Sequence, residues 1–337
     1  MSRHITMADV AREAGVSLMT VSRVVNQKEG VSQETRHFIQ DIIRKMGYHP
    51  SSIARSLATQ RTGTLGLVVP DISNPFFSGV AHGVERVAYA EGYSVLLCNT
   101  EEDPQRELDV LQLLEEKRVD GMILCSSRLE KGKLRRALAQ QPAVVLVNRW
   151  LGNRRGTLPV GSVIVDDEAG AQMATQHLLN RGHRMIGFLS GPPNSYSGQG
   201  RSRGYQVALT SAGMTFRSEF TRSCPPTVEG GQMAACQLLH AHPEITALLC
   251  YNDLVAVGAL QACSESSRTI PDDLAIVGYD DIFLAALVTP TLTTCRVSRE
   301  ELGRLSTRLL VDRMNGSSDG CEKIVLQPEL VIRSSAP

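Results

Sequence analysis

After residue 63, the sequence repeats one pattern: a short apolar run, then a longer segment with apolar residues at helical spacing. The runs are almost continuously apolar, which indicates strands buried on both faces of a parallel sheet covered by helices. Two sets of runs predict two α/β lobes, with a ligand crevice between them, outside the carboxyl ends of the strands. The predicted strands span 64–69, 94–98, 121–125, 143–147 and 163–165, then 185–189, 247–250, 274–277 and 292–297, with a last run at 324–332.

The chain has 337 residues, enough for two or three domains. We expect a head at 1–48, a linker at 49–62 and a body at 63–337. Within the body, the first lobe would comprise about 63–163 and 296–323, and the second about 164–295 and 324–337. The net charge is zero, but residues 1–62 hold nine Lys and Arg against five Asp and Glu. A basic head on an acidic body suits a head that binds phosphates.

Residues 9–26 read as two short helices bent sharply around Gly15, which can take the left-handed turn that a side chain would resist. Ser17 is a suitable N-cap for the second helix, and Val21, Val24 and Val25 face inward at helical spacing. This pattern predicts a helix-turn-helix, with an ordinary αα-corner as the alternative. The residues left pointing outward from the second helix are Leu18, Met19, Ser22, Arg23 and Asn26.

Thr6 can cap the first helix, and Ser32 can cap a third that ends at Gly47. The apolar residues of this third helix recur at helical spacing. The segment 49–58 would form only about two helical turns, too short to be stable free in water. It is either a plain linker or a segment that folds on DNA, with Leu57 as an apolar wedge. The apolar residues of the third helix are Phe38, Ile39, Ile42, Ile43 and Met46.

Several function classes find little support in the sequence. The eight cysteines include no Cys-x-x-Cys pair and the eight histidines show no metal spacing, so we expect no metal and no cofactor. The N-terminus lacks the apolar core of a signal peptide, which predicts a cytoplasmic protein. Residues 200–204 match the hydrolase motif Gly-x-Ser-x-Gly, but no strand leads directly into Ser202. We therefore expect no enzyme.

Taken together, the motifs resemble the lactose/galactose-repressor family of bacterial regulators over essentially the whole chain. The resemblance implies a helix-turn-helix head and a two-lobed body like a periplasmic binding protein. The motifs that carry it are 9–11 and 14–17 (Asp-Val-Ala, Ala-Gly-Val-Ser), 20–24 (Thr-Val-Ser-Arg-Val), 54–57 (Ala-Arg-Ser-Leu), 74–77 (Asn-Pro-Phe-Phe), 117–121 (Lys-Arg-Val-Asp-Gly), 181–183 (Arg-Gly-His) and 278–281 (Gly-Tyr-Asp-Asp).

In that family the head binds a two-fold symmetric operator as a homodimer, with the second helix in the major groove. The resemblance implies that Leu18, Met19 and Arg23 face base edges and that Leu57 enters the minor groove. An arginine fork suits guanine O6 and N7. Ala58 stands where the purine relative has a lysine, so one minor-groove contact is absent. The full set of expected DNA-binding residues is Thr6, Ser17, Leu18, Met19, Thr20, Ser22, Arg23, Asn26, Arg55, Leu57 and Ala58.

Most of the expected effector residues follow predicted strands, and each has a plainer alternative. Asn74 is either a ligand contact or only an N-cap, and Phe76 and Phe77 are either a stacking wall or core. Arg149 grips hydroxyls or pairs with a carboxylate, and Asp253 is an acceptor or an N-cap. Arg201 matches the effector arginine of the family. The expected effector-binding residues are Asn74, Phe76, Phe77, Asn148, Arg149, Ser197, Arg201, Asp253 and Asp280.

Acceptors and arginines beside aromatic rings suit a neutral or mildly acidic sugar. Pro226 stands where the purine relative has a base-stacking phenylalanine, which argues against a nucleobase. We therefore expect a sugar-gated repressor of carbohydrate genes that acts as a dimer. The alternatives are a solute-binding protein without a transcriptional role, and a hydrolase that uses Ser202.

Overall fold

The structure is a computed structural model that describes residues 5–26, 28–48, 61–141, 143–152, 160–317 and 322–337. The chain forms two compact units, Met1–Gly63 and Thr64–Pro337. Across the described residues, no helix is both long and apolar enough to cross a membrane. The predicted fold class, a helical head followed by an α/β body, is confirmed.

The head contains three helices, α1 (Met7–Ala14), α2 (Leu18–Val25) and α3 (Gln33–Met46). Thr6 and Asp9 form a reciprocal capping box at the start of α1, and the side chain of Ser17 accepts a hydrogen bond from the Thr20 amide at the start of α2. Gly15 ends α1 with φ +65°, a left-handed conformation that glycine adopts without strain.

Buried residues from all three helices form the core of the head, among them Val10, Val21 and Ile39. One apolar residue of the predicted third helix lies outside this core. Phe38 is 52% exposed, because it lies at the edge of the stripe formed by Ile39 and Ile42, which a head of three short helices does not cover.

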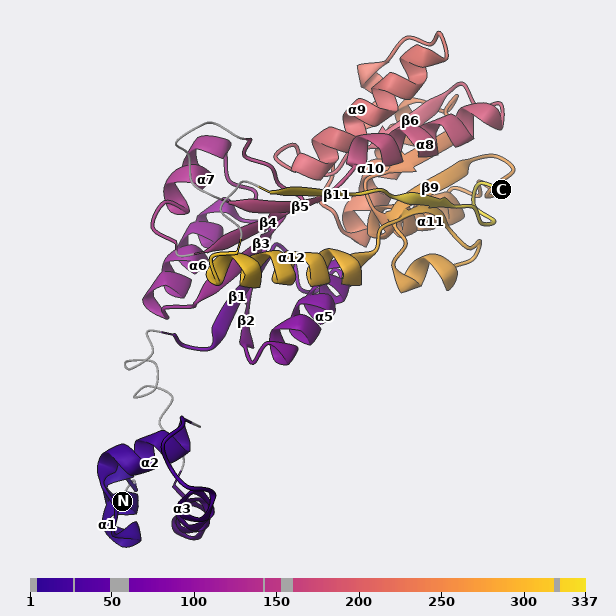
Figure 1. The fold of residues 1–337 in the computed structure, drawn as a ribbon. Helices are drawn as coiled ribbons and strands as arrows, with labels where there is room; N and C mark the ends of the chain where they lie inside the picture. Colours follow the sequence, from indigo (N-terminus) through magenta and orange to yellow (C-terminus); the bar gives the residue numbers. More distant parts are fainter. Residues whose placement is uncertain (1–4, 27, 49–60, 142, 153–159, 318–321) are drawn as a thin grey trace. The chain divides into compact units, whose positions relative to one another are not determined.

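The body contains two six-stranded sheets, each with helices on both faces (Figure 1). All strand pairs in the first sheet are parallel, as predicted. Its order is β11 (Lys323–Leu326), β5 (Gly161–Val165), β4 (Val144–Val147), β3 (Gly121–Cys125), β1 (Thr64–Val69) and β2 (Ser94–Asn99). Helices α5 (Pro75–Ala90) and α12 (Arg299–Met314) share one core cluster, and α6 (Pro104–Glu116) and α7 (Lys131–Ala137) share another.

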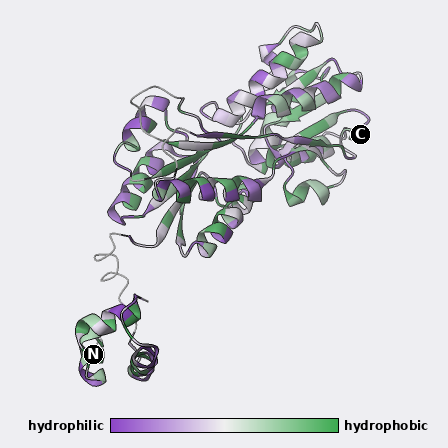
Figure 2. Ribbon diagram, viewed as in Figure 1, coloured by the Kyte–Doolittle hydropathy of each residue, from purple (hydrophilic) through white to green (hydrophobic). Residues whose placement is uncertain are grey.

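The second sheet is parallel except for one antiparallel edge, where β12 pairs with β10. Its order is β12 (Glu329–Val331), β10 (Thr293–Arg296), β9 (Ala275–Asp280), β8 (Ala247–Cys250), β6 (Ile186–Leu189) and β7 (Thr221–Arg222). Helices α8 (Asp167–Asn180) and α9 (Tyr196–Ser211) pack on one face, and α10 (Val228–Ala241) and α11 (Asp253–Glu265) on the other. Two short 3₁₀ helices, η1 (Ser218–Phe220) and η2 (Phe283–Ala286), complete this lobe. Figure 2 shows that the central strands are mainly hydrophobic, whereas the helices carry hydrophilic residues as well.

The run predicted at 324–332 needs correction. It forms two strands in different sheets, since β11 pairs with β5 of the first sheet and β12 pairs with β10 of the second. The chain therefore crosses between lobes after β5, after β10 and after β11. Apolar content alone did not separate the two strands, because β12 is only three residues long and only Gln327 and Pro328 lie between it and β11.

Helices α5 and α12 approach each other closely at two glycines. A Cβ on Gly83 would lie 2.1 Å from the carbonyl oxygen of Glu300, and one on Gly303 would lie 2.2 Å from that of Val80. Both neighbours are backbone atoms, so neither can move without displacing a helix. The contact between the two helices therefore requires glycine at both positions.

We predict that Gly83→Ala lowers the free energy of unfolding by about 1–3 kcal/mol, because overpacking must push α5 and α12 apart. Gly132→Ala in α7 is the matched control, since its Cβ would meet only the Glu130 Oε1 atom, at 3.8 Å. That variant should gain about 0.5–1 kcal/mol of helix propensity. Urea unfolding of both variants measures the difference. Equal stability of the two variants would contradict the close approach.

Candidate functional site

A narrow cavity of about 20 Å³ lies where the two lobes face each other. From the first lobe, Asn74, Glu102, Ser126 and Asn148 follow strands β1 to β4, so they stand at the carboxyl edge of the sheet. Asp280 ends β9 in the second lobe. This is the edge at which open α/β sheets bind ligands. The complete lining is Asn74, Phe76, Phe77, Glu102, Ser126, Arg128, Asn148, Ser197, Arg201, Pro226, Tyr251, Asn252 and Asp280.

Backbone strain is concentrated at this edge. Glu102, Ser126, Asn148 and Asp280 have φ values of 60°, 48°, 52° and 106°, in the region that favours glycine. Each of these residues stands at or just after the end of a strand. Side chains held in such conformations cost about 1–3 kcal/mol each and are found preferentially at ligand sites.

Arg201 is the central polar residue of the cavity. Its Nε donates to Asp167 Oδ1 at 2.9 Å, its Nη1 donates to the Tyr251 carbonyl, and its Nη2 lies 3.4 Å from Asp280 Oδ1. The guanidinium also stacks 3.6 Å from the ring centroid of Tyr279. With Asp167 on α8 and Asp280 on β9, Arg201 of α9 joins three elements of the second lobe.

Burial and charge act in opposite directions on this cluster. Burial alone would lower the pKa of Arg201, but the carboxylates of Asp167 and Asp280 outweigh it and raise the pKa above its usual value. Burial raises the pKa of Asp280 to about 7, against the opposing charge of Arg201. Asp280 therefore changes charge near neutral pH.

Arg128 is the cationic group of the first lobe. Its Nη2 donates to Glu102 Oε1 at 2.9 Å, and its side chain is almost fully buried. Burial lowers the pKa of Arg128, but interactions with the Tyr251 hydroxyl and the Glu102 carboxylate raise it further than burial lowers it. Since Tyr251 follows β8, this contact crosses from one lobe to the other.

The hydroxyl of Ser197 lacks a hydrogen-bond partner among the described residues, although it is buried and lines the cavity. A buried hydroxyl without a partner is costly and is expected where a ligand supplies the missing bond. Phe76 and Phe77 line the other side, edge to face, with ring centroids 5.1 Å apart. The cavity thus combines an apolar wall, an available hydroxyl and paired charges.

Seven of the nine predicted effector residues line this cavity, and two do not. Arg149 donates to the Leu129 carbonyl at 2.9 Å and stacks over Tyr196. Asp253 is fully buried and accepts hydrogen bonds from Thr294 Oγ1 at 2.6 Å and from the Ile282 amide at 2.8 Å. Both therefore have internal partners and lie outside the lining of this cavity. The seven are Asn74, Phe76, Phe77, Asn148, Ser197, Arg201 and Asp280.

The prediction missed five lining residues and gave Pro226 no binding role. All five follow strands, which is the signal that could have found them. Ser126, for example, comes directly after β3, as Asn148 comes directly after β4, and Arg128 follows two residues later. The missed residues are Glu102, Ser126, Arg128, Tyr251 and Asn252.

The head exposes the face that the sequence predicts for DNA. Leu18 and Met19 are 53% and 66% exposed, and Arg23 is exposed as well. A Cβ on Gly30 would lie 3.2 Å from Nη1 of Arg23, so the guanidinium packs beside this glycine. The side-chain amide of Asn26 donates to the Ser22 carbonyl at 2.9 Å. The remaining predicted contacts, Arg55, Leu57 and Ala58, lie outside the described residues.

Family models match both parts of the chain. Residues 6–51 match the model for "Bacterial regulatory proteins, lacI family". Residues 62–333 match the model for "Periplasmic binding proteins and sugar binding domain of LacI family". The chain belongs to the LacI family. It is a DNA-binding transcriptional regulator with an effector-binding body, as the resemblance implied.

LacI-family relatives with different names are about equally similar to this chain. The HTH-type transcriptional repressor PurR of Mannheimia succiniciproducens is 35% identical, over 98% of this chain and 98% of that protein. The ribose operon repressor of Escherichia coli K12 is 36% identical, over 98% of this chain and 99% of that protein. Both relatives are named as repressors.

Solved structures of the LacI family share the whole fold. The Lac repressor dimer bound to operator and the anti-inducer ONPF has a TM-score of 0.88 and 27% identity, covering 99% of both chains. The complex of the regulator CelR with cellobiose has a TM-score of 0.75 and 32% identity, covering 98% of this chain and 99% of that one.

We predict that Asp280→Asn changes how stability depends on pH. The ordinary aspartate pKa is about 3.9, whereas Asp280 in the folded protein has a pKa of about 7. Between these two pH values, folded wild-type protein keeps a proton on Asp280 that the unfolded chain has lost. Wild-type stability therefore falls as pH rises from about 4 to about 7, and asparagine removes this loss. As pH rises from 5 to 8, the free energy of unfolding of the variant should therefore increase by up to about 3 kcal/mol relative to that of the wild type.

Urea unfolding at pH 5, 6, 7 and 8 measures this difference. Asp312→Asn, an exposed change on α12, is the control and should follow the wild type at every pH. If Asp280→Asn also runs parallel to the wild type, Asp280 does not titrate in this window.

Proposed function

We propose that this protein is a repressor of carbohydrate genes, controlled by a small neutral sugar that binds in the cavity between the lobes. The observation that carries the proposal is the buried Ser197 hydroxyl, which lacks a partner among the described residues and lines the cavity beside Arg201. An available hydroxyl and an arginine fork next to an apolar wall match the edges and faces of a sugar ring.

The charges of the lining favour a neutral ligand. Arg201 is paired with Asp167 and Asp280, and Arg128 is paired with Glu102, so neither arginine needs an anionic ligand. The other polar lining groups are amides and hydroxyls, which can donate to or accept from sugar hydroxyls. Pro226 takes the position at which the purine relative stacks a base, so we favour a sugar over a nucleobase.

The cavity has room for roughly one water molecule, so a sugar requires the lobes or the lining side chains to move apart. Asp281, next to Asp280, links this movement to the crossings between lobes. Its carboxylate accepts from Arg296 Nε and Arg333 Nη2, both at 2.7 Å. Arg296 ends β10, next to one crossing, and Arg333 follows β12, the strand that the chain enters after its last crossing. A sugar would shift the equilibrium by its differential affinity for the open and closed arrangements.

The proposed DNA-binding form is a homodimer on a two-fold symmetric operator, as in the solved Lac repressor dimer. The second helix of the head would lie in the major groove, with Leu18 and Met19 near thymine methyls and Arg23 near guanine. The protein would act in the cytoplasm, where bacterial DNA lies. A solute-binding protein without a transcriptional role would not need the exposed face of α2 that carries Leu18, Met19 and Arg23.

The hydrolase alternative gains no support. Ser202 lies within helix α9, not on a turn between a strand and a helix, and its hydroxyl accepts a hydrogen bond from Gln206 at 3.2 Å. It does not line the cavity between the lobes. We therefore propose a regulator without catalytic activity.

We predict that Arg23→Ala weakens binding to the operator by about 5- to 150-fold, the loss expected for one arginine–guanine contact of ~1–3 kcal/mol. The operator is first selected with the wild-type protein from a random duplex library, and gel-shift titrations then give the affinities. Arg44→Ala removes a second exposed arginine of the head and is the control for charge. Equal losses for the two variants would exclude base reading by Arg23.

We predict that Ser197→Ala lowers sugar affinity about fivefold to tenfold, because it removes one hydrogen bond of ~1 kcal/mol. Thermal shifts against pentoses, hexoses, sugar acids, nucleosides and purines first identify the ligand, and titration calorimetry then gives its affinity. Ser202→Ala, on the same helix but outside the cavity, should bind as the wild type does. Stabilisation by a purine or a nucleoside instead of a sugar would contradict the proposed ligand class.

A further inference from the structure

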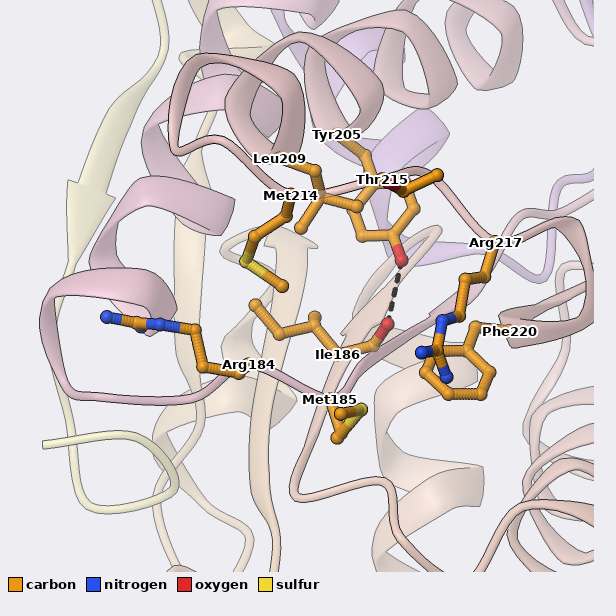
Figure 3. Close-up of a pocket in the computed structure, with 9 residues that line it drawn as sticks. All are labelled: Arg184, Met185, Ile186, Tyr205, Leu209, Met214, Thr215, Arg217 and Phe220. Atoms are coloured by element: carbon orange, nitrogen blue, oxygen red, sulfur yellow. Dashed lines mark hydrogen bonds between the residues drawn. The ribbon is translucent and has the colours of Figure 1, made fainter.

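A second cavity, of about 250 Å³, lies in the second lobe at the amino end of β6, the end of the strand away from the first cavity. Figure 3 shows Ile186, Leu209 and Met214 turned toward the same space, with the Tyr205 ring above and Phe220 to one side. Its complete lining is Arg184, Met185, Ile186, Tyr205, Leu209, Met214, Thr215, Arg217 and Phe220.

The floor of this cavity offers few hydrogen bonds. The Tyr205 hydroxyl donates to the Ile186 carbonyl at 2.7 Å, so these two polar groups satisfy each other (Figure 3). Apart from Thr215 and the two arginines, the rest of the lining is aliphatic, thioether or aromatic. The buried part of a ligand must therefore be apolar, and the volume, just below the range of drug-sized pockets, limits it to a small molecule.

The rim of the cavity is cationic. Two arginines and no carboxylate belong to the lining. Arg184 donates to the carbonyl oxygens of Leu179 and His183, at 2.9 and 3.0 Å. Arg217 lies over the Phe220 ring, 5.2 Å from its centroid, and its guanidinium makes no hydrogen bond or ion pair within the described part of the chain. Its guanidinium is therefore free to bind a carboxylate through its planar fork.

We propose that this cavity binds a small apolar carboxylate, with its hydrocarbon body on Ile186, Leu209 and Met214 and its carboxylate on Arg217. Such a ligand would contact the helix that carries the first cavity. Ser197, Arg201, Tyr205 and Leu209 follow one another at intervals of four along α9, so they form one buried stripe. The first two line the cavity between the lobes, and the last two line this one.

The test uses 3-phenylpropionate and its neutral amide as probes on the full-length protein, with methionine methyl groups labelled for NMR. The carboxylate should shift the methyl signals of Met185 and Met214 and leave those of Met7 and Met46 in the head unchanged. It should also bind about tenfold more tightly than the amide, the gain expected from one charge-assisted hydrogen bond.

Arg217→Gln should reduce carboxylate binding to the level of the amide. Arg222→Gln is the matched control, because Arg222 is exposed in the same lobe and donates to Gln237 outside the cavity. Equal affinities for carboxylate and amide, or an unchanged affinity in Arg217→Gln, would overturn the proposal. These measurements need neither DNA nor sugar, so their outcome does not depend on whether the proposed repressor function is correct.

Discussion

The body depends on how the buried guanidinium of Arg201 is paired. A charge without water is costly unless partners surround it, and removing one partner of a buried pair typically costs about 3–5 kcal/mol. Arg201 satisfies this requirement with Asp167, Asp280 and the Tyr251 carbonyl, and its flat face lies on Tyr279. Asp167 begins α8 immediately after the chain crosses between lobes. The same interaction therefore sets the position of the site and of one crossing.

The turn after β9 extends this constraint to the other crossings. Asp280 and Asp281 both have positive φ, so their side chains leave the strand in directions that an extended backbone would not allow. Asp280 faces Arg201, while Asp281 binds Arg296 and Arg333. Two neighbouring carboxylates thus connect the ligand cavity with the segments that join the lobes. A change in the cavity that moves this turn must also move those segments.

The sequence predicted the sheets better than it predicted the site, and the reason is physical. Continuous burial leaves a strong signal, so every strand of four or more apolar residues was found, whereas β12, with three residues, was not separated from β11. At the site, the position of a residue just after a strand correctly indicated the carboxyl edge of the sheet. It did not indicate the direction in which each side chain points. Asn148 lines the cavity and Arg149 beside it does not, because a positive φ at Asn148 turns the chain there. Asparagine tolerates a left-handed conformation better than most residues, but its presence alone does not show that the chain turns there.

The charge pairs of the cavity lie within lobes, and this arrangement bears on how a ligand enters. Glu102 and Arg128 both belong to the first lobe, and Arg201 pairs with Asp167 and Asp280 of the second. The polar contact between Arg128 and the Tyr251 hydroxyl does cross the gap. Separating the lobes would break that contact but leave each arginine with its carboxylate. Because no buried charge loses its counter-charge, opening avoids the largest electrostatic penalty and needs only modest differential affinity from a neutral ligand.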